Sequence, residues 1–328
     1  MTSPLPPTPI HELEVRRVWE AGGGERKAQI LEDLLRRKAD DPGWIVGFLA
    51  ALGPESLGEA LTALDPFDAH RSGPSTTEVS RAALLLGEAA RRLEPAGLAR
   101  LIVAAGGGVL ANLIEAGLLQ AGNPFAIGAE SFGEHFEALA QGLGRLAADL
   151  GVEQPSLASL LEALGEGGYH GIAGAGQPRL ELAAWLVARS GHALLQAHFV
   201  EILVDGYHPH TPRGEIAARA AAVVMAALEP ASAVAACLVR LEGEARRSLV
   251  ADALRPGDGC LGGLPLGSVE FGVDREIRRD LARFVGKLTG LEPSLLDSSE
   301  GFAAWLGGDL LAGQGPTCGW PRPGAPGS

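Results

Sequence analysis

Residues 89–101 read Ala-Ala-Arg-Arg-Leu-Glu-Pro-Ala-Gly-Leu-Ala-Arg-Leu, and within them one apolar helical segment ends and another begins. Proline cannot continue the helix before it, but it fits the first turn of the helix after it. The same Leu-x-Pro corner recurs along the chain, at Leu52-Gly53-Pro54, Leu64-Asp65-Pro66, Leu93-Glu94-Pro95, Leu228-Glu229-Pro230 and Leu291-Glu292-Pro293. The pattern predicts an all-α protein, an irregular array of short helices joined at these corners.

Apolar residues at helical spacing predict the individual helices. No segment alternates apolar and polar residues in the manner of a β-strand, so strands do not compete with this assignment. The predicted helices cover residues 10–20, 25–39, 43–52, 55–64, 77–93, 96–105, 108–121, 130–150, 155–165, 179–206, 212–228, 231–254, 273–289 and 299–311.

Glycine and proline divide the chain into five predicted parts. Proline-rich residues 1–9 and Pro/Gly-rich residues 313–328 are expected to be disordered tails. The glycine-rich stretch 166–178 is expected to be a linker between an N-terminal helical lobe, 10–165, and a C-terminal one, 179–312.

Composition and charge exclude several classes of function. Hydrophobic residues make up 46% of the 328 residues and charged residues 20%, which is enough apolar material for a real core. The formal net charge is −13, and no Lys/Arg run exceeds Arg36-Arg37-Lys38. Nucleic acid and anionic membrane surfaces need clustered positive charge, so we do not expect either as a partner.

The cysteines and the first residues bear on the compartment. Cys237, Cys260 and Cys318 are odd in number and widely spaced, which fits neither a zinc-ligand pattern nor a disulfide framework. The opening MTSPLPPTPIHELE lacks the basic and then apolar order of a signal peptide. The most apolar stretches, Leu101–Ile114 and Ile216–Val239, are interrupted by glycines or charges. We therefore expect a cytoplasmic protein with no membrane span.

The predicted helix over 130–150 has the clearest amphipathic pattern. Its apolar residues step by four and three and form one narrow seam, made of Phe132, Phe136, Leu139, Leu143, Leu146 and Leu150. Such a seam packs against one or two neighbouring helices, within the chain or in a partner.

One cluster of residues has the chemistry of a metal site. On a helix His198, Glu201 and Asp205 stand at i, i+3 and i+7, on one side of its surface. Gly206 is expected to end that helix, and His208 and His210 follow in the turn. Two carboxylates with two or three imidazoles would suit a transition metal such as zinc or iron.

The same residues also have a purely structural interpretation. The three helical residues lie at the polar edge of the helix, where a solvated surface followed by a helix-capping turn is the ordinary explanation. His192 falls among apolar residues and is expected to be a packed core histidine. Thr211 is expected to cap the next helix and Pro212 to occupy its first position.

A quarter of the chain resembles a known kind of protein. The stretch Asp41-Pro42 … Phe48-Leu49-Ala50-Ala51-Leu52-Gly53-Pro54-Glu55 is similar to helical domains of unknown function in bacterial WXG-associated polymorphic-toxin proteins. Leu86-Gly87-Glu88-Ala89-Ala90 and Ala183–Asp205 resemble further segments of those domains. The resemblance implies a non-catalytic scaffold that works with other components of an export system.

These observations favour a helical protein–protein interaction module, a scaffold, adaptor or immunity-type binder that accepts a partner helix in a groove between its helices. It would need no cofactor. Two alternatives stay open. The protein could be a metal-binding protein or metal-dependent enzyme that uses the cluster at 198–210, or a carrier of a small apolar ligand held between the lobes.

Overall fold

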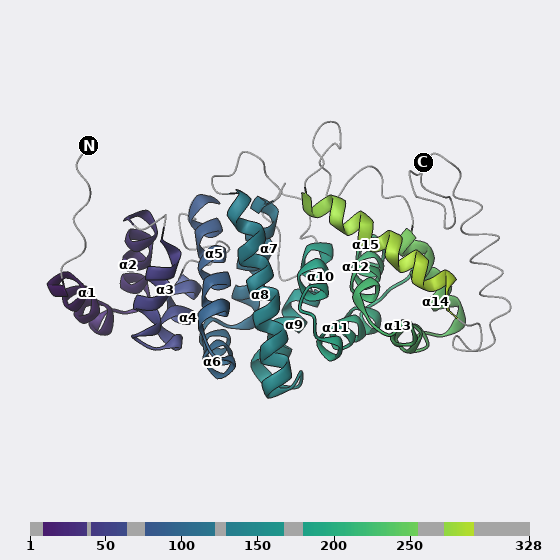
Figure 1. The fold of residues 1–328 in the computed structure, drawn as a ribbon, viewed down its shortest axis with the longest axis horizontal. Helices are drawn as coiled ribbons and strands as arrows, with labels where there is room; N and C mark the ends of the chain where they lie inside the picture. The colour runs from purple at the N-terminus through teal and green to yellow at the C-terminus, as the bar shows by residue number, and fades with distance from the viewer. Residues whose placement is uncertain are drawn as a thin grey trace.

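The computed structural model describes residues 9–37, 41–63, 76–121, 129–166, 180–254 and 272–291. These residues form fifteen helices and no strand (Figure 1), as the all-α prediction requires. The helices are α1 (Pro9–Ala21), α2 (Gly24–Arg37), α3 (Pro42–Ala50), α4 (Pro54–Ala63), α5 (Thr76–Arg92), α6 (Pro95–Ala105), α7 (Gly107–Ala121), α8 (Ala129–Leu150), α9 (Pro155–Glu166), α10 (Leu180–Ala188), α11 (Ala193–Asp205), α12 (Pro212–Ala227), α13 (Ala231–Leu238), α14 (Gly243–Leu254) and α15 (Gly272–Thr289).

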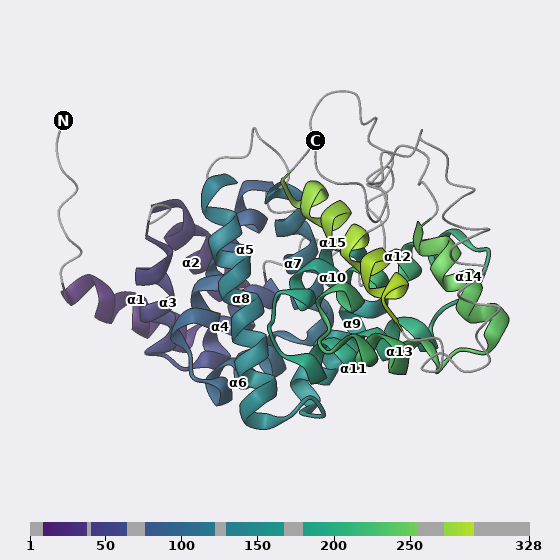
Figure 2. The same ribbon diagram turned by 45° about the vertical axis from the view of Figure 1, so that its right-hand side comes forward.

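The helices pack as an elongated two-layered array. Most helices contact the one two places further along the chain, as in α2 with α4, α3 with α5, α4 with α6, α5 with α7, α10 with α12, and α12 with α14. The array runs from α1 at one end to α14 at the other, and α15 returns across α12 (Figures 1 and 2). In this arrangement outer helices such as α8 bury one side on their neighbours and expose the other to solvent, whereas every residue of α10 is buried.

Proline marks the corners as the sequence predicts. Pro54 and Pro95 are the first residues of α4 and α6, and Pro230 directly precedes α13. The corners at Leu64-Asp65-Pro66 and Leu291-Glu292-Pro293 extend outside the described residues. So do the predicted helix over 299–311, the predicted tails except Pro9, and the predicted linker except Glu166.

The prediction of a single helix over 179–206 is wrong. The chain turns at 189–192, between α10 and α11. Gly191 has a φ of 68°, a left-handed conformation that glycine adopts without strain. Nδ1 of His192 then accepts a hydrogen bond from the backbone N–H of Leu195 at 3.2 Å, which caps α11.

The prediction of a single helix over 231–254 is also wrong. The chain turns at 239–242, between α13 and α14. The buried Arg246 folds back on this turn, where its Nε donates to the carbonyl of Leu238 and its Nη2 to the carbonyl of Leu241, each at 2.9 Å. Carbonyls left over at the end of a helix need such donors, and a charged donor makes a strong one.

Leucine and alanine fill the core, with a few large aromatic side chains. On α8 the predicted seam is confirmed for its middle, where Phe136, Leu139, Leu143 and Leu146 are buried. It is wrong for Leu150, which is 43% exposed at the end of the helix.

No single described helix is both long enough and apolar enough to cross a membrane. Among pairs of described helices, only α6 combined with α7 as far as Ile114 reaches that length and composition, and the two segments meet at an angle of 97°.

Candidate functional site

The structure places three of the predicted metal-site residues on one helix, α11. Nδ1 of His198 lies 3.7 Å from Oε2 of Glu201. The guanidinium of Arg240, from the turn between α13 and α14, lies 3.1 Å from Oε1 of Glu201 and 3.1 Å from Oδ2 of Asp205. A cation of the chain itself therefore joins the two carboxylates.

Cys237 lies close to this ion-pair cluster. Burial, together with the negative charge of Glu201, raises the pKa of the Cys237 thiol from 9.0 to about 11, although Arg240 acts in the opposite direction. A thiol with so high a pKa keeps its proton at neutral pH. It is therefore a poor nucleophile and a poor metal ligand.

His208 and His210 lie in the turn after α11 and have exposed side chains. The structure uses this turn to start α12, because Thr211 accepts a hydrogen bond from the N–H of Gly214 at 2.9 Å and donates one to the carbonyl of His208 at 2.9 Å. The predicted roles of Thr211 and Pro212 are thus confirmed. Among the described residues, no group of three or more His, Cys, Asp or Glu side chains is arranged to hold a metal ion.

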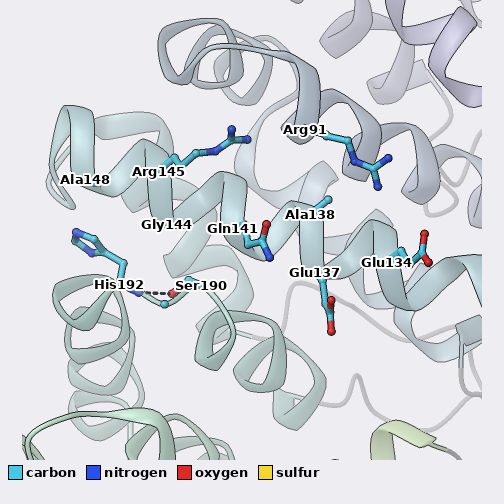
Figure 3. Close-up of a pocket in the computed structure, with 11 residues that line it drawn as sticks. Arg91, Glu134, Glu137, Ala138, Gln141, Gly144, Arg145, Ala148, Ser190 and His192 are labelled. Atoms are coloured by element: carbon cyan, nitrogen blue, oxygen red, sulfur yellow. Dashed lines mark hydrogen bonds between the residues drawn. The ribbon is translucent and has the colours of Figure 1, made fainter.

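A different region, beside α8, has room for a ligand or partner. It is an open groove of about 700 Å³ between α5, α8 and the turn from α10 to α11 (Figure 3). Its lining is polar and charged or small, and comprises Arg91, Glu134, Glu137, Ala138, Gln141, Gly144, Arg145, Ala148, Ser190, Gly191 and His192. A carrier of an apolar ligand would need an enclosed cavity with an apolar lining, whereas this groove is open and lined by several charged side chains.

The turn at 189–192 forms one wall of the groove and is held firmly. A Cβ added at Gly144 would lie 2.2 Å from the carbonyl oxygen of Ser190, so only glycine lets α8 approach this turn so closely. On the other side, Arg189 pairs with Asp280 of α15 at 3.2 Å and stacks over Trp185, 4.4 Å from the centre of its ring.

His192 stands at the groove and is half-buried, so its prediction as a packed core histidine is wrong. Because the chain turns at 189–192, His192 does not lie on the apolar face of a continuous helix. Its neighbour Ser190 accepts a hydrogen bond from the backbone N–H of His192 at 3.4 Å (Figure 3). The imidazole nitrogen Nδ1 is engaged in capping α11. These hydrogen bonds therefore do not join Ser190 and His192 as a nucleophile and its base.

The face of α8 that lines the groove carries charged side chains that are exposed to solvent. Glu134, Glu137, Gln141 and Arg145 are exposed, and Figure 3 shows them along one length of the helix. Neither glutamate has an ion pair with another described residue. Arg145 is anchored to α5, since its Nη2 donates to the carbonyl of Ala90 at 2.5 Å.

No pattern in the sequence predicted this groove as a site. The apolar seam of α8 does imply that the opposite side of the helix is exposed. The spacing of Glu134, Gln141 and Arg145 could therefore have predicted the polar face that lines the groove. The sequence could not predict the wall made by Ser190 and His192, because that wall exists only where the chain turns between α10 and α11.

No family model, no curated protein and no solved structure matches this chain. The resemblance to helical domains of WXG-associated toxin proteins therefore stays a prediction.

Proposed function

We propose that this protein is a non-catalytic helical interaction module, a scaffold, adaptor or immunity-type binder that docks another protein chain on the exposed face of α8. The observation that carries the proposal is the open groove along this helix, in which the carboxylates of Glu134 and Glu137 have no ion pair with another described residue. Charges of this kind contribute to specificity when a partner supplies their counterparts.

The dimensions of the groove favour a helical occupant. Its α8 lining extends from Glu134 to Ala148, which at 1.5 Å per residue is about 21 Å, or about four turns of a second helix. The small side chains of Ala138 and Ala148 leave space between the larger ones, where a neighbouring helix can approach. A helix laid along a groove is a common mode of peptide recognition.

The rigidity of the groove supports the same proposal. The wall at 189–192 is fixed to α8 by the close approach at Gly144 and to α15 by the Arg189–Asp280 ion pair. A surface that is already formed loses little conformational freedom when a partner docks.

Native mass spectrometry of the tagged chain, isolated gently from its own cells, tests this function. We compare the wild type with a double variant of the groove, Glu134→Arg with Glu137→Arg. The matched control is Glu242→Arg with Glu244→Arg, which makes the same change in charge at two exposed residues around the turn before α14.

We expect the wild type and the control to carry a protein of defined mass in fixed stoichiometry, and the groove variant to lose it. Equal retention of that protein by both double variants would contradict the α8 site. A wild-type chain that carries no protein at all would contradict the proposed function.

A further inference from the structure

The open charges of α8 change sign along the helix. Glu134 and Glu137 lie on one side of Gln141 and Arg145 on the other. Glu137 and Arg145 are each four residues from Gln141, so both are displaced from it by about 6 Å along the axis, in opposite directions. At 100° per residue, Glu134, Glu137, Arg145 and Ala148 all fall within about 40° of Gln141 around the helix.

The charges on this face of α8 are complementary to those on the same face of a second, antiparallel α8. If a second α8 runs antiparallel, with the two-fold axis passing between the two Gln141 side chains, then Arg145 of each copy is level with Glu137 of the other. A two-fold interface pairs residue i with j and j with i in this way. Two Arg145–Glu137 ion pairs would then form at once. They would give Glu137 the cation that it lacks in the described fold, and Arg145, whose Nη2 donates to the carbonyl of Ala90, has further N–H donors for the contact.

The next position outward is complementary as well. Ala148 and Glu134 are each seven residues from Gln141, so Glu134 of one copy is level with Ala148 of the other. Ala148 lines the groove together with His192. The small side chain of Ala148 leaves the space that the incoming Glu134 needs.

The surroundings of α8 permit such an approach. Figures 1 and 2 show α8 in front of its neighbours, with no described helix crossing its outer side. The acidic chain as a whole repels a second copy at long range, so the local pairing of opposite charges has to select this face and this register.

We propose that the occupant of the α8 groove is a second copy of this chain, docked antiparallel about a two-fold axis at Gln141. This inference rests on the proposed function and names the partner at the same site.

Analytical ultracentrifugation with charge-reversal variants tests the pairing. The single variants are Arg145→Glu and Glu137→Arg, and each puts like charges opposite one another in its own dimer. Mixing the two variants restores both pairs, because one supplies two acidic and the other two basic side chains at these positions.

We expect wild-type chain to form dimers as its concentration rises. Each single variant should weaken dimerisation about tenfold or more, since two exposed ion pairs are lost and two repulsive contacts replace them. The equimolar mixture should return to wild-type affinity as a mixed dimer. Circular dichroism checks the fold of each variant. If Arg145→Glu does not fold for want of its bond to Ala90, then Glu137→Arg alone still tests the contact.

Two outcomes would overturn the inference: a wild-type chain that stays monomeric at all concentrations, and single variants that dimerise like the wild type. The failure of the proposed function is a separate result. A different protein, lost from the groove double variant in native mass spectrometry, would leave the proposed function in place while ruling out the second copy as its occupant.

Discussion

On α11 the carboxylates of Glu201 and Asp205 face the guanidinium of Arg240, whereas on α8 the carboxylates of Glu134 and Glu137 face a groove. Both pairs stand at helical spacing beside an apolar face, and in the sequence they look alike. The fold pairs the first with a cation and leaves the second unpaired among the described residues. Charge pattern alone therefore does not show which carboxylates are paired within the fold, because that depends on the position of the nearest opposite charge.

The largest expected effect concerns the thiol beside the paired carboxylates. With its pKa raised to about 11, Cys237 should hold about a hundredfold less thiolate at pH 8 than an ordinary cysteine of pKa 9.0. Its alkylation by iodoacetamide should be correspondingly slow, as mass spectrometry of a Cys260→Ser, Cys318→Ser chain will show. Glu201→Gln should speed the reaction because it removes a charge that raises the pKa.

The same shift fixes the direction of a pH effect. Between pH 9 and pH 11 the unfolded thiol loses its proton while the folded thiol keeps it, so the contribution of Cys237 to stability should fall as the pH rises. Cys237→Ala should remove this slope from denaturant titrations. Alkylation at the ordinary rate would show that the α11 region is more open than described.

The next effect concerns the wall of the groove. Gly144→Ala forces a Cβ against the carbonyl of Ser190 and should lower the free energy of unfolding by about 1 to 3 kcal/mol. Gly286→Ala is the control, since nothing lies within 4 Å of its added Cβ and α15 should gain up to about 1 kcal/mol. Urea titrations will compare the two variants, and equal effects would place the turn at 189–192 further from α8.

A smaller effect is expected at the paired charges. Arg240→Ala removes ion pairs to two partly exposed carboxylates and should lower the free energy of unfolding by about 1 kcal/mol at low salt. High salt should diminish the difference because it screens exposed charges. A loss that does not depend on salt would mean that Arg240 acts through packing instead.

The smallest effect is expected at the open charges. Glu137→Ala removes no ion pair within the described fold, so the free energy of unfolding of dilute protein should change by less than about 0.5 kcal/mol. Its effect should appear in association, where Glu137 meets its counterpart. A large loss of stability in dilute solution would show that Glu137 serves the fold of the single chain.

The sequence predicted the fold class and most helix ends, because prolines such as Pro54 and Pro95 act on the backbone next to them. It missed the turn at 189–192, where a single glycine and a capping histidine interrupt an otherwise continuous apolar pattern. It missed the turn at 239–242 because Arg246 stabilises that turn from the following helix.

The candidate site was harder to predict than the fold. Local spacing brought His198, Glu201 and Asp205 together correctly, since all three lie on α11. The guanidinium that joins the carboxylates belongs to Arg240, which lies in a later turn of the chain. No local sequence pattern predicts its contact with Glu201 and Asp205. The groove of α8 likewise depends on contacts with α5 and with the turn after α10.

Photo-crosslinking in cells tests our proposal that the exposed face of α8 docks a protein, whereas the face of α11 that pairs with Arg240 does not. A photoreactive amino acid replaces Gln141 on α8 in one strain and Asp205 on α11 in another. We expect a discrete adduct with a protein chain, specifically a second copy of this chain, from position 141 alone. An adduct from position 205 alone, or equal adducts from both positions, would contradict it.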